Sequence, residues 1–487
     1  MSAVGNRAAV LTLARVANYG LTIISPVILV RLLTVAQFGR YREFLLYATV
    51  LHTVSVFSIN SSLLYLIPAE PQCRWRVVRQ TAILLAGTSV LVVALMAAID
   101  HASGGHLVGP FLLPLGAFTL FATNLDFWDD YWVATNRAGL VFVYSSVRLA
   151  ARVAVATVTA AITHDVRAII WALVALEGAR CLAAAIVWLR VQRSAQEPAL
   201  KEPWRAQLRY CLPSGVAGVL SLLTRNLGGL VVANSLGVVA FAEYAVGRSG
   251  SPIITILRSS VSNIVLPEMV RRGRGSRDAA LALWRRATVV NAIVLLPLAV
   301  LLLRYAKPLI AIVFGVKYVG AAIVLQIFAL VIVRECFDFS PAVRALNRTR
   351  PLVESNLISL LACALLLALL VPVAGVGGAM AAVALAGWID ALWLAYRTVQ
   401  AYRITLGELL PWSGIGKTAV AALAAGGVLI AIPWGALLGV GGMALGSAAY
   451  LLTFAALMLV LRVPEAQILL EWVRRLTPLR AANSRRT

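Results

Sequence analysis

Long apolar runs alternate with short polar connections along the whole chain. A helix that crosses the hydrocarbon layer of a bilayer needs about 20 mostly apolar residues. Fourteen runs satisfy this length, at 8–30, 43–67, 79–99, 111–133, 140–162, 168–189, 210–233, 242–266, 287–303, 318–340, 352–371, 376–396, 414–433 and 437–461. The pattern predicts an all-α polytopic membrane protein with about 14 transmembrane helices and no room for a folded domain outside the membrane.

Positive charge gathers in alternate connections, which indicates how the spans are oriented. The connections after the second, sixth, eighth and tenth spans are rich in Arg and Lys, whereas those at 100–110, 234–241, 372–376 and 434–436 carry none. Because short loops rich in Arg and Lys stay cytoplasmic, both termini are expected on the cytoplasmic side. The connections at 31–42 and 304–317 carry positive charge on the opposite side and break this rule.

Two short segments match each other at a constant offset. The sequences "LTVAQFGRY" (33–41) and "LGVVAFAEY" (236–244) share their Leu, Val, Phe and Tyr positions, and each follows an apolar run. An even number of spans separates them, so a duplication would relate two halves of the same orientation by a pseudo-twofold axis along the membrane normal. The alternative is chance similarity between short apolar strings.

Composition narrows the functions that such a protein could have. Hydrophobic residues make up 61% of the chain and charged residues 13%, and the mean hydropathy is +0.88. The formal net charge is +23, and nearly all of the positive charge is arginine. A basic balance indicates nucleic acid, anionic lipid or an anionic substrate. Nucleic acid is excluded as a partner because the arginines are spread among loops and spans and no soluble module carries them.

The sequence contains no motif for a metal or a cofactor, and we expect neither. The five cysteines have no CxxC or other metal-ligand spacing. The segment "GIGKT" (414–418) lacks the GxxxxGK spacing and the preceding strand of a phosphate-binding loop. His101 and His106 lie in a glycine-rich turn, where solvated histidines are the simpler interpretation. No catalytic residue is predicted.

Five segments, in fixed order, resemble one family. They are "VRLLTVAQFGRY", "YCLPSG", "SLGVVAFAEYAVG", "AKPLIAIVFGVKYVGAA" and "VPVAGVGGAMAA". Together they make the chain similar to the polysaccharide or oligosaccharide-lipid flippases of the multidrug/oligosaccharidyl-lipid/polysaccharide (MOP) exporter superfamily. The resemblance implies two six-helix lobes plus two further helices, with a central cavity lined mainly by spans 1, 2, 7 and 8. Glu243 departs from the family pattern, in which a small or polar residue is more usual.

The expected domains follow from the spans and the resemblance. They are an N-terminal lobe with a cytoplasmic linker at 1–207 (spans 1–6), a C-terminal lobe at 208–398 (spans 7–12), spans 13 and 14 at 399–461, and a cytoplasmic amphipathic helix with a basic tail at 462–487. In that last segment, apolar residues share one helical side and arginines are available to anionic headgroups.

Arginines and small polar residues share single faces of the spans that the resemblance assigns to the cavity. Successive helix residues turn by about 100°, and the polar groups fall within sectors of about 80°. The predicted substrate-binding residues are Arg15, Asn18 and Thr22 on span 1, Ser221 and Arg225 on span 7, and Arg248, Ser251, Thr255, Arg258 and Ser262 on span 8. Arginine inside a span favours a functional site facing a polar cavity. Near the outer end of its span, Arg248 would equally well extend to the headgroups.

Other intramembrane charges favour structural pairing. Arg334 and Asp338 are four residues apart, and Glu177 and Arg180 three, so each pair is expected to neutralise itself within one helix. Arg148 and Arg152 are expected to pair with the acidic residues Asp126, Asp129 and Asp130 at the end of span 4, with ion coupling at Asp126 as the alternative. Asp390 has no obvious partner and is open to either role.

The sequence therefore predicts a transporter, not an enzyme. The resemblance implies that it moves a polyprenyl-pyrophosphate-linked oligosaccharide from the inner to the outer leaflet of the cytoplasmic membrane, by alternating access. The expected partners are this anionic lipid-linked glycan, membrane lipids and a glycan polymerase or glycosyltransferases, with the protein itself a monomer. The alternatives are a multidrug exporter of the same superfamily, which would need an acidic cavity for cationic drugs, and an integral membrane enzyme of envelope glycan assembly.

Overall fold

The computed structural model describes residues 20, 24–69, 71–105, 108–135, 137–192, 203–273, 276–346, 350–432 and 434–465. The described residues form helices and turns without any strand. This agrees with the predicted all-α class.

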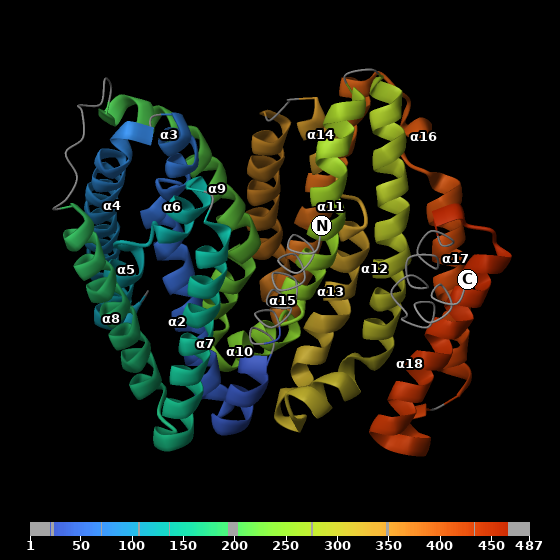
Figure 1. The fold of residues 1–487 in the computed structure, drawn as a ribbon. Coiled ribbons are helices and arrows are strands. Elements are labelled where there is room, and N and C mark those ends of the chain that lie inside the picture. Colours follow the sequence, from blue (N-terminus) through green and yellow to red (C-terminus); the bar gives the residue numbers. More distant parts are fainter. Residues whose placement is uncertain are drawn as a thin grey trace, which may run out of the picture. The chain divides into compact units, whose positions relative to one another are not determined.

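The chain packs into two compact units, shown as ribbons in Figure 1. Unit 1 comprises the residues up to Ser249 together with Val373–Ala379, and unit 2 comprises Gly250–Pro372 and the residues from Met380 onward. These units are defined by which residues pack together, whereas the predicted lobes are defined by duplication of the sequence. The predicted lobe boundary at 207/208 therefore stays a prediction.

Unit 1 contains a helical segment at 24–32 and twelve named elements before the chain passes to unit 2. Its elements are α2 (Val35–Val56), η1 (Asn60–Ser62), α3 (Leu63–Ala69), η2 (Pro71–Cys73), α4 (Arg74–Ala102), η3 (Gly109–Phe111), α5 (Leu112–Thr123), α6 (Trp128–Ala134), α7 (Ala138–Thr163), α8 (Val166–Gln192), α9 (Pro203–Ser235) and α10 (Gly237–Gly247).

Unit 2 begins with the helix that follows Gly250. Its elements are α11 (Ser251–Gly273), α12 (Arg277–Val313), η4 (Val316–Ala321), α13 (Ala322–Glu335), α14 (Ser340–Ala345), α15 (Arg350–Tyr402), α16 (Leu406–Leu409), α17 (Trp412–Ala431) and α18 (Trp434–Val460). The residues Val373–Ala379 of α15 belong to unit 1, and Gly375 interrupts this helix with a left-handed φ of 53°. Glycine adopts that conformation at no steric cost, so two expected spans follow each other directly at this residue.

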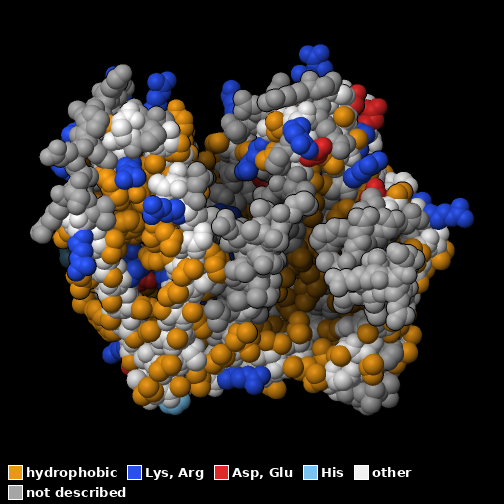
Figure 2. Space-filling view, viewed as in Figure 1, with side chains coloured by type: hydrophobic (Ala, Val, Ile, Leu, Met, Phe, Trp, Pro, Cys, Tyr) orange, Lys and Arg blue, Asp and Glu red, His pale blue; other side chains and the backbone are white. Residues whose placement is uncertain are grey.

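Nine described helices are long and apolar enough to cross a membrane, or ten if the bent pair Val35–Val56 and Asn60–Pro68 is one span. Figure 2 shows hydrophobic side chains over much of the visible face, as expected of a surface that faces lipid. The chain is therefore a multi-pass membrane protein. The total of fourteen spans stays a prediction. Most of the first expected span (8–30) and nearly all of the 462–487 segment lie outside the described residues.

Two of the expected spans that carry predicted site residues are broken in the described structure. The run at 111–133 divides into α5 and α6, with residues 124–127 between them, and the run at 242–266 divides into α10 and α11 at Arg248–Gly250. Glycines at 247 and 250 and a proline at 252 explain the second break, since they weaken a helix interior and favour a new helix start. The prediction that Arg248 and Arg258 lie on one continuous helix was therefore wrong.

The start of α2 explains why a predicted loop carries so much charge. Thr34 caps the helix in a reciprocal capping box with Gln37, so the helix begins at Val35 and not at residue 43. Arg40 and Arg42, which broke the charge rule as loop residues, are therefore inside the helix.

The repeated segments pack against each other within unit 1. Helices α2 and α10 each begin in one copy of the repeat, and they are in extensive contact. A Cβ atom added at Gly39 would lie 2.3 Å from the backbone oxygen of Val238 and 2.7 Å from its Cγ1. Only glycine permits this close backbone approach.

Replacing Gly39 by alanine should therefore destabilise unit 1. The backbone oxygen of Val238 cannot rotate away, so α2 and α10 must separate, at a cost of about 1–3 kcal/mol. Gly87→Ala is the matched control, because nothing lies within 4 Å of a Cβ added at that position in α4. The measurement is thermal unfolding of both variants in detergent. Equal melting temperatures for the two would contradict the close approach.

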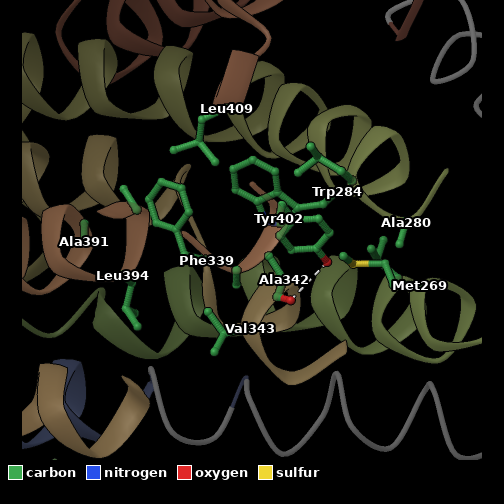
Figure 3. Packing of buried hydrophobic residues seen from close by; sticks show 14 residues of the cluster. Met269, Ala280, Trp284, Phe339, Ala342, Val343, Ala391, Leu394, Tyr402 and Leu409 are labelled. Atoms are coloured by element: carbon green, nitrogen blue, oxygen red, sulfur yellow. Dashed lines mark hydrogen bonds between the residues drawn. The ribbon is translucent and has the colours of Figure 1, made fainter. Parts of the chain in front are cut away.

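A tryptophan-centred core holds one polar segment of unit 2 in place (Figure 3). Trp284 is 1% exposed and packs on Phe339, and its indole N–H donates to the backbone oxygen of Asp338 at 2.7 Å. The Tyr402 hydroxyl donates to the backbone oxygen of Ala342 at 3.1 Å. These contacts fix the turn between α13 and α14, which carries Asp338.

Candidate functional site

Three arginines, from α2, from α9 and from the residue that follows α10, gather in unit 1. Arg248 donates from Nη1 to the backbone oxygen of Arg225 at 3.2 Å, and it interacts electrostatically with Arg42. Arg42 lies within the candidate span that begins at Val35, and Arg225 lies within the span Gln207–Ser235. We call Arg42, Arg225 and Arg248 the arginine set.

The side chain of Arg248 turns back onto α9 and α10. Its Nη1 also donates to the Tyr244 hydroxyl at 3.1 Å, and its guanidinium carbon lies 5.4 Å from the centre of the Tyr244 ring. Its Nε is buried and has no partner among the described residues. Because every one of these contacts is with a neutral group, the charge of Arg248 is not neutralised by them.

Arg42 has no hydrogen bond or ion pair to any residue that the structure describes. Among the described residues, Tyr41 and Arg248 interact with it electrostatically, and the charge of Arg248 repels it. A guanidinium keeps its charge under all ordinary conditions. Two arginines without a carboxylate partner inside a membrane-spanning unit are costly unless water or an anion meets them.

The remaining predicted residues of unit 1 are only partly covered by the structure. Ser221 lies one turn before Arg225 on α9 and is half-buried. Arg225 itself is exposed. Arg15, Asn18 and Thr22 lie outside the described residues.

In unit 2, Arg258 is held between two carboxylates. Its Nε lies 2.6 Å from Glu335 Oε2, and its Nη1 lies 2.7 Å from Asp338 Oδ2. Ser262 donates to the same Asp338 oxygen at 2.7 Å. The prediction that Arg258 and Ser262 share one face of the helix is thus confirmed. The sequence places no carboxylate in the helical turns around Arg258, but the structure supplies two carboxylates from other parts of the chain.

The other hydroxyl groups of α11 make local bonds or none. Thr255 is exposed, and its hydroxyl donates to the backbone oxygen of Ser251 at 3.0 Å. Ser251 is the first residue of α11 and is half-buried. Neither hydroxyl forms a hydrogen bond with Asp338 in the described structure.

The pairing predicted for Arg334 was wrong. Arg334 pairs with Asp390 of α15 and with the adjacent Glu335, at 3.0 Å, whereas Asp338 pairs with Arg258. The chain leaves the helix after Glu335, so the spacing of four residues no longer brings Arg334 and Asp338 onto one face. Asp390 therefore has a partner, and this partner comes from another helix.

The charged cluster predicted in unit 1 is confirmed at its centre. Arg148 pairs with Asp126, and Arg152 and Arg180 pair with Glu177 at 2.6 and 2.8 Å. Asp129 forms no ion pair in the described structure, and its Oδ2 instead accepts a hydrogen bond from Ser145 at 3.3 Å. The interhelical cluster thus uses Glu177, which the sequence had assigned to a local pair alone.

Sequence reasoning missed Arg42 as a member of the site. The prediction placed Arg42 in a connection, one residue before the expected second span. The signal that locates it is the capping box Thr34-x-x-Gln37, which marks the start of a helix.

A family model described as "Polysaccharide biosynthesis protein" matches residues 28–323. No curated protein matches the chain significantly in sequence.

Solved structures share the fold. The lipid II flippase MurJ in an inward closed conformation matches with a TM-score of 0.72 and 12% identity, over 93% of this chain and 99% of that one. A multidrug resistance MATE family transporter of the MOP superfamily, in an inward-facing conformation, matches with a TM-score of 0.57 and 13% identity, over 79% and 95%. A MOP superfamily transporter from Pyrococcus furiosus, described as having a binding pocket of reversed polarity, matches with 0.53 and 15%, over 81% and 95%.

Proposed function

Because the chain belongs to the polysaccharide biosynthesis protein family, we propose that it flips a polyprenyl-pyrophosphate-linked oligosaccharide from the inner to the outer leaflet of the cytoplasmic membrane. The family match and the transporter fold support this proposal. Movement would occur by alternating access, with both termini on the cytoplasmic side. The protein would act as a transporter and not as an enzyme.

The observation that carries the proposal is the arginine set. Arg42 and Arg248 have no carboxylate partner among the described residues, although they lie in a membrane-spanning unit. A pyrophosphate diester carries two negative charges, and guanidinium groups bind such oxygens through charge-assisted, often bidentate hydrogen bonds. The set therefore offsets the desolvation cost that the headgroup would otherwise meet in the membrane.

The hydroxyl groups of the predicted site would form hydrogen bonds with the sugar. Ser221 lies one turn from Arg225 on α9, and serine hydroxyls both donate to and accept from sugar hydroxyls. The lipid tail would stay in the surrounding bilayer, and a glycan polymerase or glycosyltransferases would supply and consume the substrate. We propose a monomer as the working form.

The multidrug alternative fits the described charges less well. A cationic drug would be repelled by Arg42 and Arg248, whose charges no described carboxylate balances. An enzyme of glycan assembly would need an acid, a base or a nucleophile at the membrane edge. His101, one of the two histidines considered for that role, is exposed at the end of α4, and His106 lies outside the described residues.

The test is a flipping assay in proteoliposomes. The probe is a fluorescent polyprenyl-pyrophosphate-linked oligosaccharide, and its transfer is followed by an external reagent that modifies only exposed sugars. The control probe is a polyprenyl glycoside with the same sugar but no phosphate. We expect rapid transfer of the first probe and no acceleration of the second. Equal rates for both, or for neither above empty liposomes, would overturn the proposal.

A further inference from the structure

The break between α5 and α6 is an ordered feature of unit 1. Helix α5 ends at Thr123 and α6 begins at Trp128, and Leu125 between them has a left-handed φ of 56°. A side chain at such a φ is strained, and the strain persists only when surrounding contacts hold it. Broken helices inside a membrane protein are places where ions and substrates bind.

Arg180 of α8 holds this break. Its guanidinium donates to the backbone oxygens of Phe121, of Ala122 at 3.2 Å, of Asn124 at 3.0 Å and of Leu125 at 3.3 Å. The oxygens of Phe121 and Ala122 lie in the last turn of α5, where a helix end leaves carbonyl groups without partners, and those of Asn124 and Leu125 lie in the break itself. The side-chain amide of Asn60 donates to the backbone oxygen of Asp126 at 2.8 Å. The backbone of Asp126 is thereby held in place within the break.

His52 of α2 also contacts the break. Its Nε2 lies 3.5 Å from Asp126 Oδ2, and its Nδ1 lies 3.3 Å from the hydroxyl of Thr123. One imidazole thus contacts the last residue of α5 and the acidic residue of the break. Histidine is the side chain whose ordinary titration falls between about pH 5 and 8.

The charged groups around His52 would respond to a proton on its ring. The charged groups that act on it are Asp126 from the break, Arg148 and Arg152 from α7, and Glu177 from α8. Arg180 pairs with Glu177, and Asp129 and Asp130 of α6 interact with Asp126. Asp126 already pairs with Arg148, so a proton on His52 would compete with that pair for the same carboxylate.

We infer that His52 and Asp126 form a proton-binding site, and that loading it shifts α2 against the α5–α6 break. With a neutral ring, Arg148 keeps Asp126 and the arrangement described here is stable. With a charged ring, the ring and Arg148 repel each other and compete for one carboxylate, and α2, which carries the ring, moves to relieve this repulsion. Chains of His and carboxylate groups inside a membrane are the means by which proton-driven proteins carry out such a step.

Helix α2 connects this site with the arginine set. Arg42 and His52 are ten residues apart on the same helix, which is about 15 Å at 1.5 Å per residue. A movement of α2 therefore changes the position of Arg42. This coupling to transport rests on the proposed function, whereas the proton-binding site itself does not.

Proton binding is tested without any transport measurement. The chain has four histidines, so a protein labelled at its histidine rings gives few NMR signals. The signal that disappears in His52→Asn should titrate in the intact protein, and its midpoint should move in Asp126→Asn. His101→Asn is the matched control, since His101 is exposed. A His52 signal that does not titrate, or whose midpoint is the same in Asp126→Asn, would overturn the inference.

The coupling is tested in the flipping assay with an imposed proton gradient. A gradient of two pH units changes the proton's equilibrium occupancy ratio by up to about 100-fold, so the intact protein and His101→Asn should transport several times faster with it. His52→Asn should show the same rate with and without the gradient. Stimulation of His52→Asn equal to that of the intact protein would overturn the coupling. Absence of flipping in every protein, with a titrating His52, would instead overturn the proposed function and leave the proton-binding site standing.

Discussion

Arg42→Glu is expected to abolish flipping of the pyrophosphate-linked probe while leaving the protein folded. Each charge-assisted hydrogen bond contributes about 1.5–3 kcal/mol, so losing one and adding a repulsive charge should lower the rate by at least about 100-fold. The measurement is the proteoliposome assay. Arg42→Lys keeps the charge without the bidentate geometry, so an intermediate rate is expected.

The reason to choose Arg42 is its electrostatic surroundings. Arg42 and Arg248 repel each other, so a glutamate at position 42 replaces this repulsion by attraction. The melting temperature of Arg42→Glu should therefore equal or exceed that of the intact protein, even though transport is lost. Loss of function without loss of stability separates a substrate contact from a structural contact.

Arg167→Glu is the matched control for this reversal. Arg167 is exposed in the first turn of α8, where an acidic residue is compatible with the helix dipole. Transport by this variant should stay close to that of the intact protein. If Arg42→Glu transports as fast as Arg167→Glu, the arginine set does not bind the headgroup.

Arg258 is a less suitable residue for the same experiment. Glu335 and Asp338 hold its guanidinium in unit 2, so reversal of its charge would place three carboxylates together. Loss of transport after that change would report on folding as much as on substrate binding. The sequence favoured Arg258 as a substrate contact because no carboxylate lies within its own helical turns.

Local patterns predicted the helices well, since the length and composition of each apolar run are properties of the segment itself. They also located the Glu177–Arg180 pair, because residues three apart on one helix are always neighbours. The partners of Arg258 and Asp390 could not be found in this way. They come from other helices, and a single sequence contains no information on which helix faces which.

The two broken helices illustrate the same limit. The run at 111–133 is apolar enough overall to read as one span despite Asn124 and Asp126, yet the chain leaves the helix at 124–127. The interruption is stabilised by a guanidinium from α8, 55 residues or more along the chain. An arginine that binds backbone oxygens of a distant segment leaves no periodic signal in the sequence.

Arg180→Met is expected to be the most destabilising single change in unit 1. The side chain of Arg180 is 9% exposed, so its loss leaves four backbone oxygens without this donor and weakens the neutralisation of Glu177, which is 1% exposed. Removing one partner from a buried ion pair costs about 3–5 kcal/mol. Methionine fills a similar volume without supplying a donor, so the loss reflects the guanidinium and not a cavity.

The measurement is thermal unfolding in detergent, with Arg167→Met as the control at an exposed position of the same helix. Arg180→Lys should fall between the two, because an ammonium keeps the ion pair but does not reach the set of oxygens that the guanidinium binds. Because Arg180 also fixes the break that carries Asp126, the same variant should change the titration midpoint of the His52 signal. A melting temperature equal to that of Arg167→Met would show that the break is held by other contacts.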